Sequence, residues 1–292
     1  MVLRAALTSL VFLALPGIAP AQSARLDTHG EIAVSAHSYA PDNGIGKVDL
    51  TFAFPLTRGG RLGAEIGTYM FVLPQKRPHE TYVSLTWDNR WRLGVVRPAY
   101  DFVLPSVFEE AAPLLAYERA EYARAYTTTT AMRQGAVPWG LSYTDDREPF
   151  GWAVSLHHAS KGGFSSASVA ARWQTGPWHL AAAAEGIWDV SGGYDGTNAK
   201  LGVTYVQDRW SLGLAWLHPE AENLPDALAL TGTVAVSQKL SLSAFGEFTE
   251  GGRDDAYGVA AQYALTDRAS LSLAATQWRD EGGVHLTVTH RF

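Results

Sequence analysis

The sequence predicts an all-β protein, a 16-stranded antiparallel transmembrane β-barrel with a long third loop folded into its lumen. Three observations lead to this prediction. Apolar and polar residues alternate in short runs along almost the whole chain, turn-forming residues separate the runs, and the alternation stops only between Pro98 and Ala136. Because successive side chains of a strand point to opposite faces, each run would have one apolar and one polar face.

The first 21 residues have the pattern of a secretory signal peptide. One cation, Arg4, precedes an apolar run from Ala5 to Leu15, and residues 19–21 form an A-x-A cleavage site. The run is shorter than the ~20 residues that a membrane-spanning helix needs. We therefore expect residues 1–21 to be cleaved, and residues 22–292 to form the transmembrane barrel, with residues 98–136 as its constriction loop.

Five alternating runs precede the long segment. In the second of them, Val48 and Leu50 share one face, and Lys47 and Asp49 share the other. Glycine-rich or polar turns such as TRGGR and DNR separate the runs. The five expected strands span residues 26–39, 47–55, 61–72, 81–87 and 91–97.

The alternation resumes directly after the long segment and continues to the last residue. The final run alternates Val284, Leu286 and Val288 with polar residues and stops at Phe292. Together with the first five, the later runs make 16 strands. The eleven later strands are expected at residues 137–144, 150–159, 165–174, 178–187, 198–206, 210–217, 227–236, 239–248, 256–265, 269–278 and 284–292.

The segment from Pro98 to Ala136 is rich in alanine, glutamate and leucine. We expect one or two short helical turns there, broken at Pro113. A connection of this length is rare in a compact domain unless it is functional. Connections elsewhere tend to alternate between tight and longer ones, as in a membrane barrel with turns facing the periplasm and loops facing outside. From a periplasmic N-terminus, the long segment is the third external loop.

A soluble β-sandwich or barrel would also alternate. Three features favour the membrane barrel: the strand number is high and even, the apolar face persists in nearly every strand, and aromatic residues mark the strand ends. The tryptophans expected in the aromatic girdles are Trp87, Trp91, Trp139, Trp152, Trp173, Trp178, Trp210 and Trp216.

Composition narrows the function further. Without Arg4 the chain has 22 basic and 29 acidic residues, a net charge of −7, which does not favour nucleic acid as a partner. There is no cysteine, so disulfides and thiolate metal sites are excluded. The nine histidines lack metal-ligand spacing along the sequence. We expect no metal and no cofactor.

The order of parts resembles the general porins of Gram-negative bacteria, in particular the small 16-stranded trimeric type. It consists of five strands, a long acidic third loop, eleven strands and a terminal Phe292. The stretch RLGVVRPAYDFVLPSVF, residues 92–108, resembles the family's fifth strand entering its constriction loop. The chain departs from the family's common Leu-Gly-Arg, because Val95 follows Gly94 and the next arginine is Arg97.

The resemblance implies a homotrimer in the cell outer membrane, surrounded by lipid and lipopolysaccharide. Small hydrophilic solutes and ions would diffuse passively through its water-filled channel, with loop carboxylates set against basic residues of the wall. The negative net charge suggests a weak cation preference. The candidates for the constriction are Glu109, Glu110, Glu118 and Glu121 on the loop, Lys47, Arg92, Arg97 and Arg172 on the wall, and Arg133 at the loop's exit. Alternation also directs Glu31, Asp49, Glu65, Glu185, Lys200 and Glu247 into the lumen.

Two other functions have to be weighed. A substrate-selective outer-membrane channel, for a sugar or another small solute, could use Tyr117, Tyr122 and Tyr126 as a stacking surface. An outer-membrane hydrolase would need a nucleophile within reach of a base and an orienting group. His157 and His158 have no flanking sequence of that kind, so we do not expect an enzyme. Calcium at acidic loop residues has no specific motif in its favour.

Overall fold

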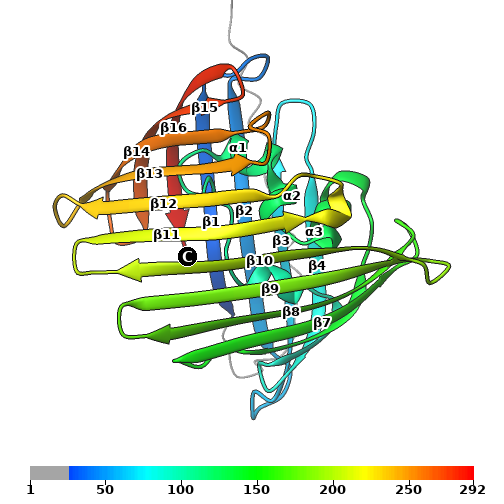
Figure 1. The fold of residues 1–292 in the computed structure, drawn as a ribbon. Coiled ribbons are helices and arrows are strands. Elements are labelled where there is room, and N and C mark those ends of the chain that lie inside the picture. Colours follow the sequence, from blue (N-terminus) through cyan, green and yellow to red (C-terminus); the bar gives the residue numbers. More distant parts are fainter. Residues whose placement is uncertain (1–25) are drawn as a thin grey trace, which may run out of the picture.

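The computed structural model describes residues 26–292, and the expected signal peptide at 1–21 lies outside them. Sixteen strands pair antiparallel with their neighbours, and β1 pairs with β16, so the sheet closes into a barrel (Figure 1). The predicted fold class and number of strands are confirmed.

The strands before the long loop are β1 (Asp27–His37), β2 (Gly44–Pro55), β3 (Leu62–Val72), β4 (His79–Trp87) and β5 (Trp91–Val95). Those after it are β6 (Trp139–Asp145), β7 (Phe150–Ala159), β8 (Phe164–Thr175), β9 (Trp178–Asp189), β10 (Tyr194–Val206), β11 (Trp210–Pro219), β12 (Ala227–Ala235), β13 (Leu240–Thr249), β14 (Ala256–Ala264), β15 (Ala269–Trp278) and β16 (Glu281–Arg291).

Several expected external loops are shorter than the sequence suggested. β10 begins at Tyr194 instead of residue 198, and a register shift against β9 between Tyr194 and Gly196 keeps it paired. Gly196 has a φ of 152°, which glycine adopts readily. The connection at 38–43 is also no longer than the turn at 56–61. Loop length is therefore a weak guide here to which end of the barrel faces outside, because polar strand ends extend into the expected loops.

The two faces of the wall have opposite polarity. On β4, Val83 and Leu85 are about half exposed on the outer face, whereas Tyr82, Ser84 and Thr86 are buried on the inner face. The same inversion runs around the barrel: large apolar side chains are exposed outside and hydroxyl or charged side chains lie inside. A soluble barrel would show the reverse, so this pattern is typical of a wall that faces lipid.

Three helices lie in the connection between β5 and β6, residues 96–138, which we call the third loop. They are α1 (Pro113–Glu118), α2 (Ala120–Ala123) and α3 (Tyr126–Gln134), and a 3₁₀ turn, η1 (Ala99–Phe102), precedes them. The expectation of a helix broken at Pro113 is wrong, because Pro113 begins α1, where its missing N–H costs nothing. No helix in residues 26–292 is long and apolar enough to cross a membrane.

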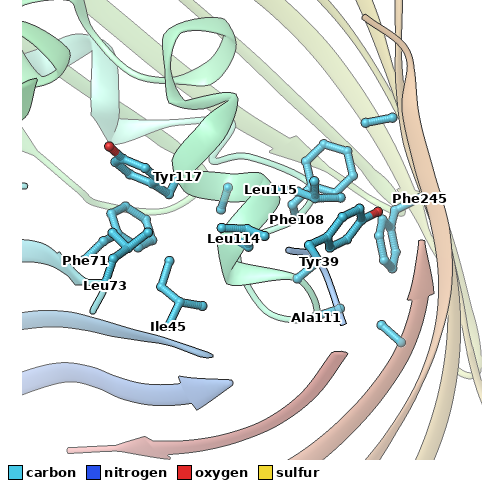
Figure 2. Packing of buried hydrophobic residues seen from close by; sticks show 14 of the residues in the cluster. Tyr39, Ile45, Phe71, Leu73, Phe108, Ala111, Leu114, Leu115, Tyr117 and Phe245 are labelled. Atoms are coloured by element: carbon cyan, nitrogen blue, oxygen red, sulfur yellow. The ribbon is translucent and has the colours of Figure 1, made fainter. Parts of the chain in front are cut away.

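The apolar core lies between the third loop and the inner wall. Figure 2 shows Leu114 and Leu115 of α1 beside Phe108, with Phe71 of β3 on one side and Phe245 of β13 on the other. Phe108 meets Phe245 edge to face, with ring centres 5.7 Å apart. The third loop thus contacts two separate parts of the barrel wall.

Candidate functional site

The third loop turns into the lumen because β5 is short. β5 ends at Val95, and Ala99 and Tyr100 of η1 then lie against the inner wall. The Ala99 N–H donates to Ser155 Oγ at 2.9 Å, and the Tyr100 N–H donates to Ser168 Oγ at 3.2 Å. Small hydroxyl side chains on β7 and β8 let the loop backbone approach and satisfy its donors.

Glu109 attaches the part of the third loop that precedes α1 to the barrel wall. Lys47 Nζ lies 2.5 Å from Glu109 Oε2 and 2.7 Å from Glu31, and Arg124 lies 2.5 Å from Glu109 Oε1. The Tyr69 hydroxyl donates to the same carboxylate at 2.8 Å. Burial disfavours the charged carboxylate, but Arg124 and Lys47 outweigh it and hold the pKa of Glu109 well below its usual range. Glu109 is therefore ionised at neutral pH.

Arg119 fixes the loop to a second part of the wall. Its guanidinium contacts Glu247 of β13 at 3.1 Å and Asp254 of the β13–β14 loop at 3.0 Å. The Arg119 and Glu247 side chains are both fully buried. Next to them, Tyr122 of α2 packs on Leu217 and Ala229 of β11 and β12. The α1–α2 region is thereby attached to β11–β13, apart from the Lys47 contact on β2.

Two carboxylates accept hydrogen bonds from the N-terminus of α3. Asp101 Oδ1 accepts the Ala125 N–H at 2.8 Å, and Glu185 Oε2 of β9 accepts the Tyr126 N–H at 2.7 Å. The Thr127 hydroxyl also donates to Glu185 at 2.7 Å. Negative charge at a helix N-terminus pairs with free N–H groups and the positive end of the helix dipole. These contacts stabilise a helix that contains four consecutive threonines, which are poor helix formers.

Glu222 makes a further contact with α3. It lies in η2 (Glu220–Glu222), between β11 and β12, and accepts a hydrogen bond of 2.6 Å from the Thr129 hydroxyl. Burial raises the pKa of Glu222 to about 7, against the lowering effect of that hydrogen bond. Glu222 therefore takes up a proton near neutral pH, unlike Glu109.

We predict a pH-dependent stability from Glu222. An unfolded glutamate has a pKa of about 4.3, so the folded protein binds this proton more tightly, and stability falls as pH rises from about 4 to about 7. Glu222→Gln should remove part of that fall, leaving the variant more heat-stable than the wild type at pH 8 and closer to it at pH 4. Thermal unfolding followed by circular dichroism checks this. Parallel pH profiles for the two proteins would contradict it.

The structure brings few of the predicted constriction residues together. Lys47 contacts Glu109 across the loop–wall boundary, and Arg133 contacts Glu121 within the third loop, with one hydrogen bond of 2.9 Å. Glu118 is the last residue of α1.

The three remaining predicted cations all pair with carboxylates of the barrel itself. Arg92 contacts Glu65 at 2.8 Å, Arg97 forms an ion pair with Asp49, and Arg172 forms one with Asp146. On the loop side, Glu110 is exposed and contacts Arg291 of β16 at 2.7 Å. Glu109 thus faces a base of the wall, whereas Arg92, Arg97 and Arg172 pair with acids of the barrel and not with the third loop.

Residues that sequence reasoning did not select as site residues hold the loop in place. Arg119, Arg124 and Asp101 lie on the loop itself. Lys200 of β10 donates to the carbonyls of Leu104 and Ala123 at 3.2 and 2.7 Å. Alternation placed Glu185, Lys200 and Glu247 in the lumen, but no local signal indicates that a helix docks on them.

A cavity of about 520 Å³ separates loop residues 104–111 from β10–β13. It adjoins two others, of about 370 Å³ near Arg97 and about 390 Å³ near Arg172, with which it shares Asp49 and Leu104 respectively. Its charged side is formed by Glu31, Lys47, Asp49, Glu109, Glu110 and Arg124. Its opposite side carries Glu247 and otherwise uncharged residues, among them Thr204, Gly213, Ala215, Ala229, Thr231, Thr233, Ser243 and Ala244.

The predicted girdle tryptophans fall into two groups by their place on the strands. Trp139 at the start of β6 and Trp216 near the end of β11 lie toward the end of the barrel with the third loop. Six lie at the end with the tight turns: Trp87, Trp91, Trp152, Trp173, Trp178 and Trp210. Trp152 is half-buried against Tyr143, and the other seven are more than 40% exposed.

Solved structures similar to this chain include three engineered barrels. One comes from a study of the asymmetric conductivity of engineered proteins, with 17% identity and a TM-score of 0.69. A double mutant of the Rh. blastica porin has 15% identity and a TM-score of 0.69, and a triple mutant of the Rhodopseudomonas blastica porin has 14% and 0.65. Each comparison covers 92% of this chain and 100% of the other.

The chain has the porin fold. No protein-family model matches the sequence, and no curated protein sequence matches it either. The likeness to these porins therefore lies in the 16-stranded architecture, which this chain shares over the whole length of the three compared structures.

Proposed function

We propose that the protein is an outer-membrane channel through which small hydrophilic solutes and ions diffuse passively, narrowed by the third loop. The observation that carries the proposal is the inverted wall: large apolar side chains cover the outside of a closed barrel, and charged and hydroxyl side chains surround hollows inside it. A 16-stranded barrel is too wide for its own side chains to fill. The space that the third loop leaves free would be the aqueous path.

Export and membrane placement belong to the same proposal. Residues 1–21 would direct the chain out of the cytoplasm, and residues 22–292 would insert into the outer membrane, in contact with lipid and lipopolysaccharide. The exposed tryptophans at both ends of the barrel support two interfacial girdles. A homotrimer follows from the resemblance to the general porins.

Liposome swelling tests the proposed function. The refolded protein is inserted into liposomes, which are diluted into isotonic sugars of increasing size. Swelling should be fast for the smallest sugars and should fall steadily with size, because a wet passage of fixed width discriminates by size. Liposomes without protein are the control. No swelling with the smallest sugar would contradict the proposal.

A substrate-selective channel has less support. Tyr117 and Tyr122 are 3% and 2% exposed, and the Tyr117 hydroxyl accepts a hydrogen bond from Arg133. Tyr126 packs edge to face on Phe164. These rings pack the third loop against its surroundings and offer little free surface for stacking a sugar.

We propose that solutes pass between loop residues 104–111 and β10–β13. Thr231 lines that cavity, whereas its neighbour Leu230 points outward and is 40% exposed. We expect Thr231→Trp to reduce single-channel conductance strongly, because the indole would fill the passage. Leu230→Trp, the matched control on the same strand, should leave conductance unchanged. Equal conductance in both variants would place the path elsewhere.

The proposed constriction also predicts a change in ion selectivity. Glu109 and Glu110 line the same cavity, so the double change to glutamine removes the negative charge that pairs with Lys47 and Arg124 and the one that pairs with Arg291. The reversal potential across a salt gradient should shift toward anions. Glu250→Gln, in the exposed β13–β14 loop, is the control. If the reversal potential stays at the wild-type value, these glutamates do not line the passage.

A further inference from the structure

Two histidines face each other where the barrel closes. His37 of β1 and His285 of β16 are directly paired, although they lie near opposite ends of the chain. The backbone hydrogen bond beside them joins the Ser38 N–H to the Val284 carbonyl at 3.1 Å. His37 and His285 therefore form a non-hydrogen-bonded pair, the arrangement in which cross-strand side chains come closest.

Both imidazoles lack hydrogen-bond partners for most of their nitrogens. His37 is 6% exposed and His285 is fully buried. Neither ring nitrogen of His37 has a partner, and Nδ1 of His285 has none. Buried polar atoms are normally paired, and a neutral imidazole carries both a donor and a lone pair. Three nitrogens on two adjacent rings are therefore available to a ligand.

The remaining nitrogen holds His285 in a fixed orientation. His285 Nε2 lies 3.1 Å from Thr276 Oγ1, which lies 3.0 Å from the Tyr39 hydroxyl. This row of hydrogen bonds uses Nε2 of His285 and leaves its Nδ1 free. Histidines that bind metals usually have one nitrogen fixed in this way by an outer partner, while the other nitrogen binds the ion.

We propose that His37 and His285 bind one transition-metal ion of the Zn²⁺ or Ni²⁺ class on the inner side of the β1–β16 seam. Their ring centres are 5.9 Å apart, and two imidazoles sharing one ion at ~2.0–2.1 Å from each nitrogen have centres about 5–6 Å apart. Nitrogen ligands without carboxylates favour these ions over Mg²⁺ and Ca²⁺.

The site has two protein ligands. No group of three or more His, Cys, Asp or Glu residues suited to a metal comes together in residues 26–292, so water would complete the coordination. The ion would link the first and last strands of the barrel and would stabilise only the closed sheet. This inference rests on the fold and not on the proposed channel function.

Zinc titration of the refolded protein in detergent tests the inference. Calorimetry should show one Zn²⁺ bound per chain, and the heat-unfolding midpoint should rise with Zn²⁺ but not with Mg²⁺. His37→Phe and His285→Phe keep a ring in place but remove its nitrogens, and each should abolish binding. Thr276→Val should weaken binding about 10- to 100-fold by releasing the His285 ring.

His158→Ala is the matched control, because this histidine is exposed on the outer wall, and the variant should bind Zn²⁺ like the wild type. Zinc binding that survives both phenylalanine variants, or a wild type that binds no Zn²⁺, would overturn the inference. If a phenylalanine variant fails to refold, the Thr276→Val affinity and the Zn²⁺-against-Mg²⁺ comparison on the wild type decide the question.

Discussion

Replacing α1–α3, residues 113–134, with a short Gly/Ser linker is expected to raise single-channel conductance several-fold. These helices pack on Ile45 of β2 and Phe71 of β3. On the other side, Tyr122 and Arg119 of the replaced segment contact β11–β13. The helices therefore extend across the lumen between these strands. The hydrogen-bond ladder that closes the barrel runs from strand to strand without them, so the variant should still form a barrel.

The control for this experiment is an equal linker placed in the exposed β13–β14 loop at 250–253, which should leave conductance near the wild-type value. Planar-bilayer recording measures both variants. A conductance that is unchanged on removal of the helices would mean that the third loop does not narrow the path.

Glu247→Ala is expected to release the third loop from β13. Arg119 and Glu247 are fully buried as a pair, and removal of one member of such a pair typically costs about 3–5 kcal/mol, since the other charge stays buried. Asp254 alone would then hold Arg119. We expect a lower unfolding midpoint and a noisier open-channel current, because the loop samples positions away from the wall.

Arg291→Ala supplies the comparison. Arg291 and Glu110 form a half-exposed pair, and exposed pairs contribute only about 0–1 kcal/mol. The unfolding midpoint of this variant should therefore be close to that of the wild type, and its open-channel current should show no added noise. Similar losses of stability in Glu247→Ala and Arg291→Ala would show that the Arg119 pair does not anchor the loop.

The strands could be predicted from the sequence because each carries its own signal. On β4, Val83 and Leu85 alternate with Ser84 and Thr86, and that pattern alone assigns the outer and inner faces. β7 and β15 have the predicted bounds, residue for residue. Errors lie at strand ends such as Tyr194, where a register shift extends a strand through residues that look like a loop.

The third loop could not be predicted in the same way. Its helices depend on tertiary contacts: four threonines form part of α3 because Asp101, Glu185 and Glu222 accept their hydrogen bonds or those of the helix N-terminus. Two of these carboxylates come from strands or turns far along the chain. Local propensity therefore underestimates the helix.

Part of the candidate site could be predicted from the sequence. Alternation directs Lys47 inward, and the acidic loop supplies Glu109, which the structure joins to it. Nothing in the sequence indicates that Arg97 pairs with Asp49, since this contact depends on how the chain turns after β5. The His37–His285 pair likewise appears only when the two ends of the sheet meet.

Single-channel recording of the refolded wild-type protein in a planar bilayer tests the central claim most directly. We predict discrete conductance steps that grow in proportion to salt concentration, because ions would cross a water-filled passage between the third loop and β10–β13. A protein that inserts into the bilayer, and still gives no steps under any applied voltage, would contradict the account.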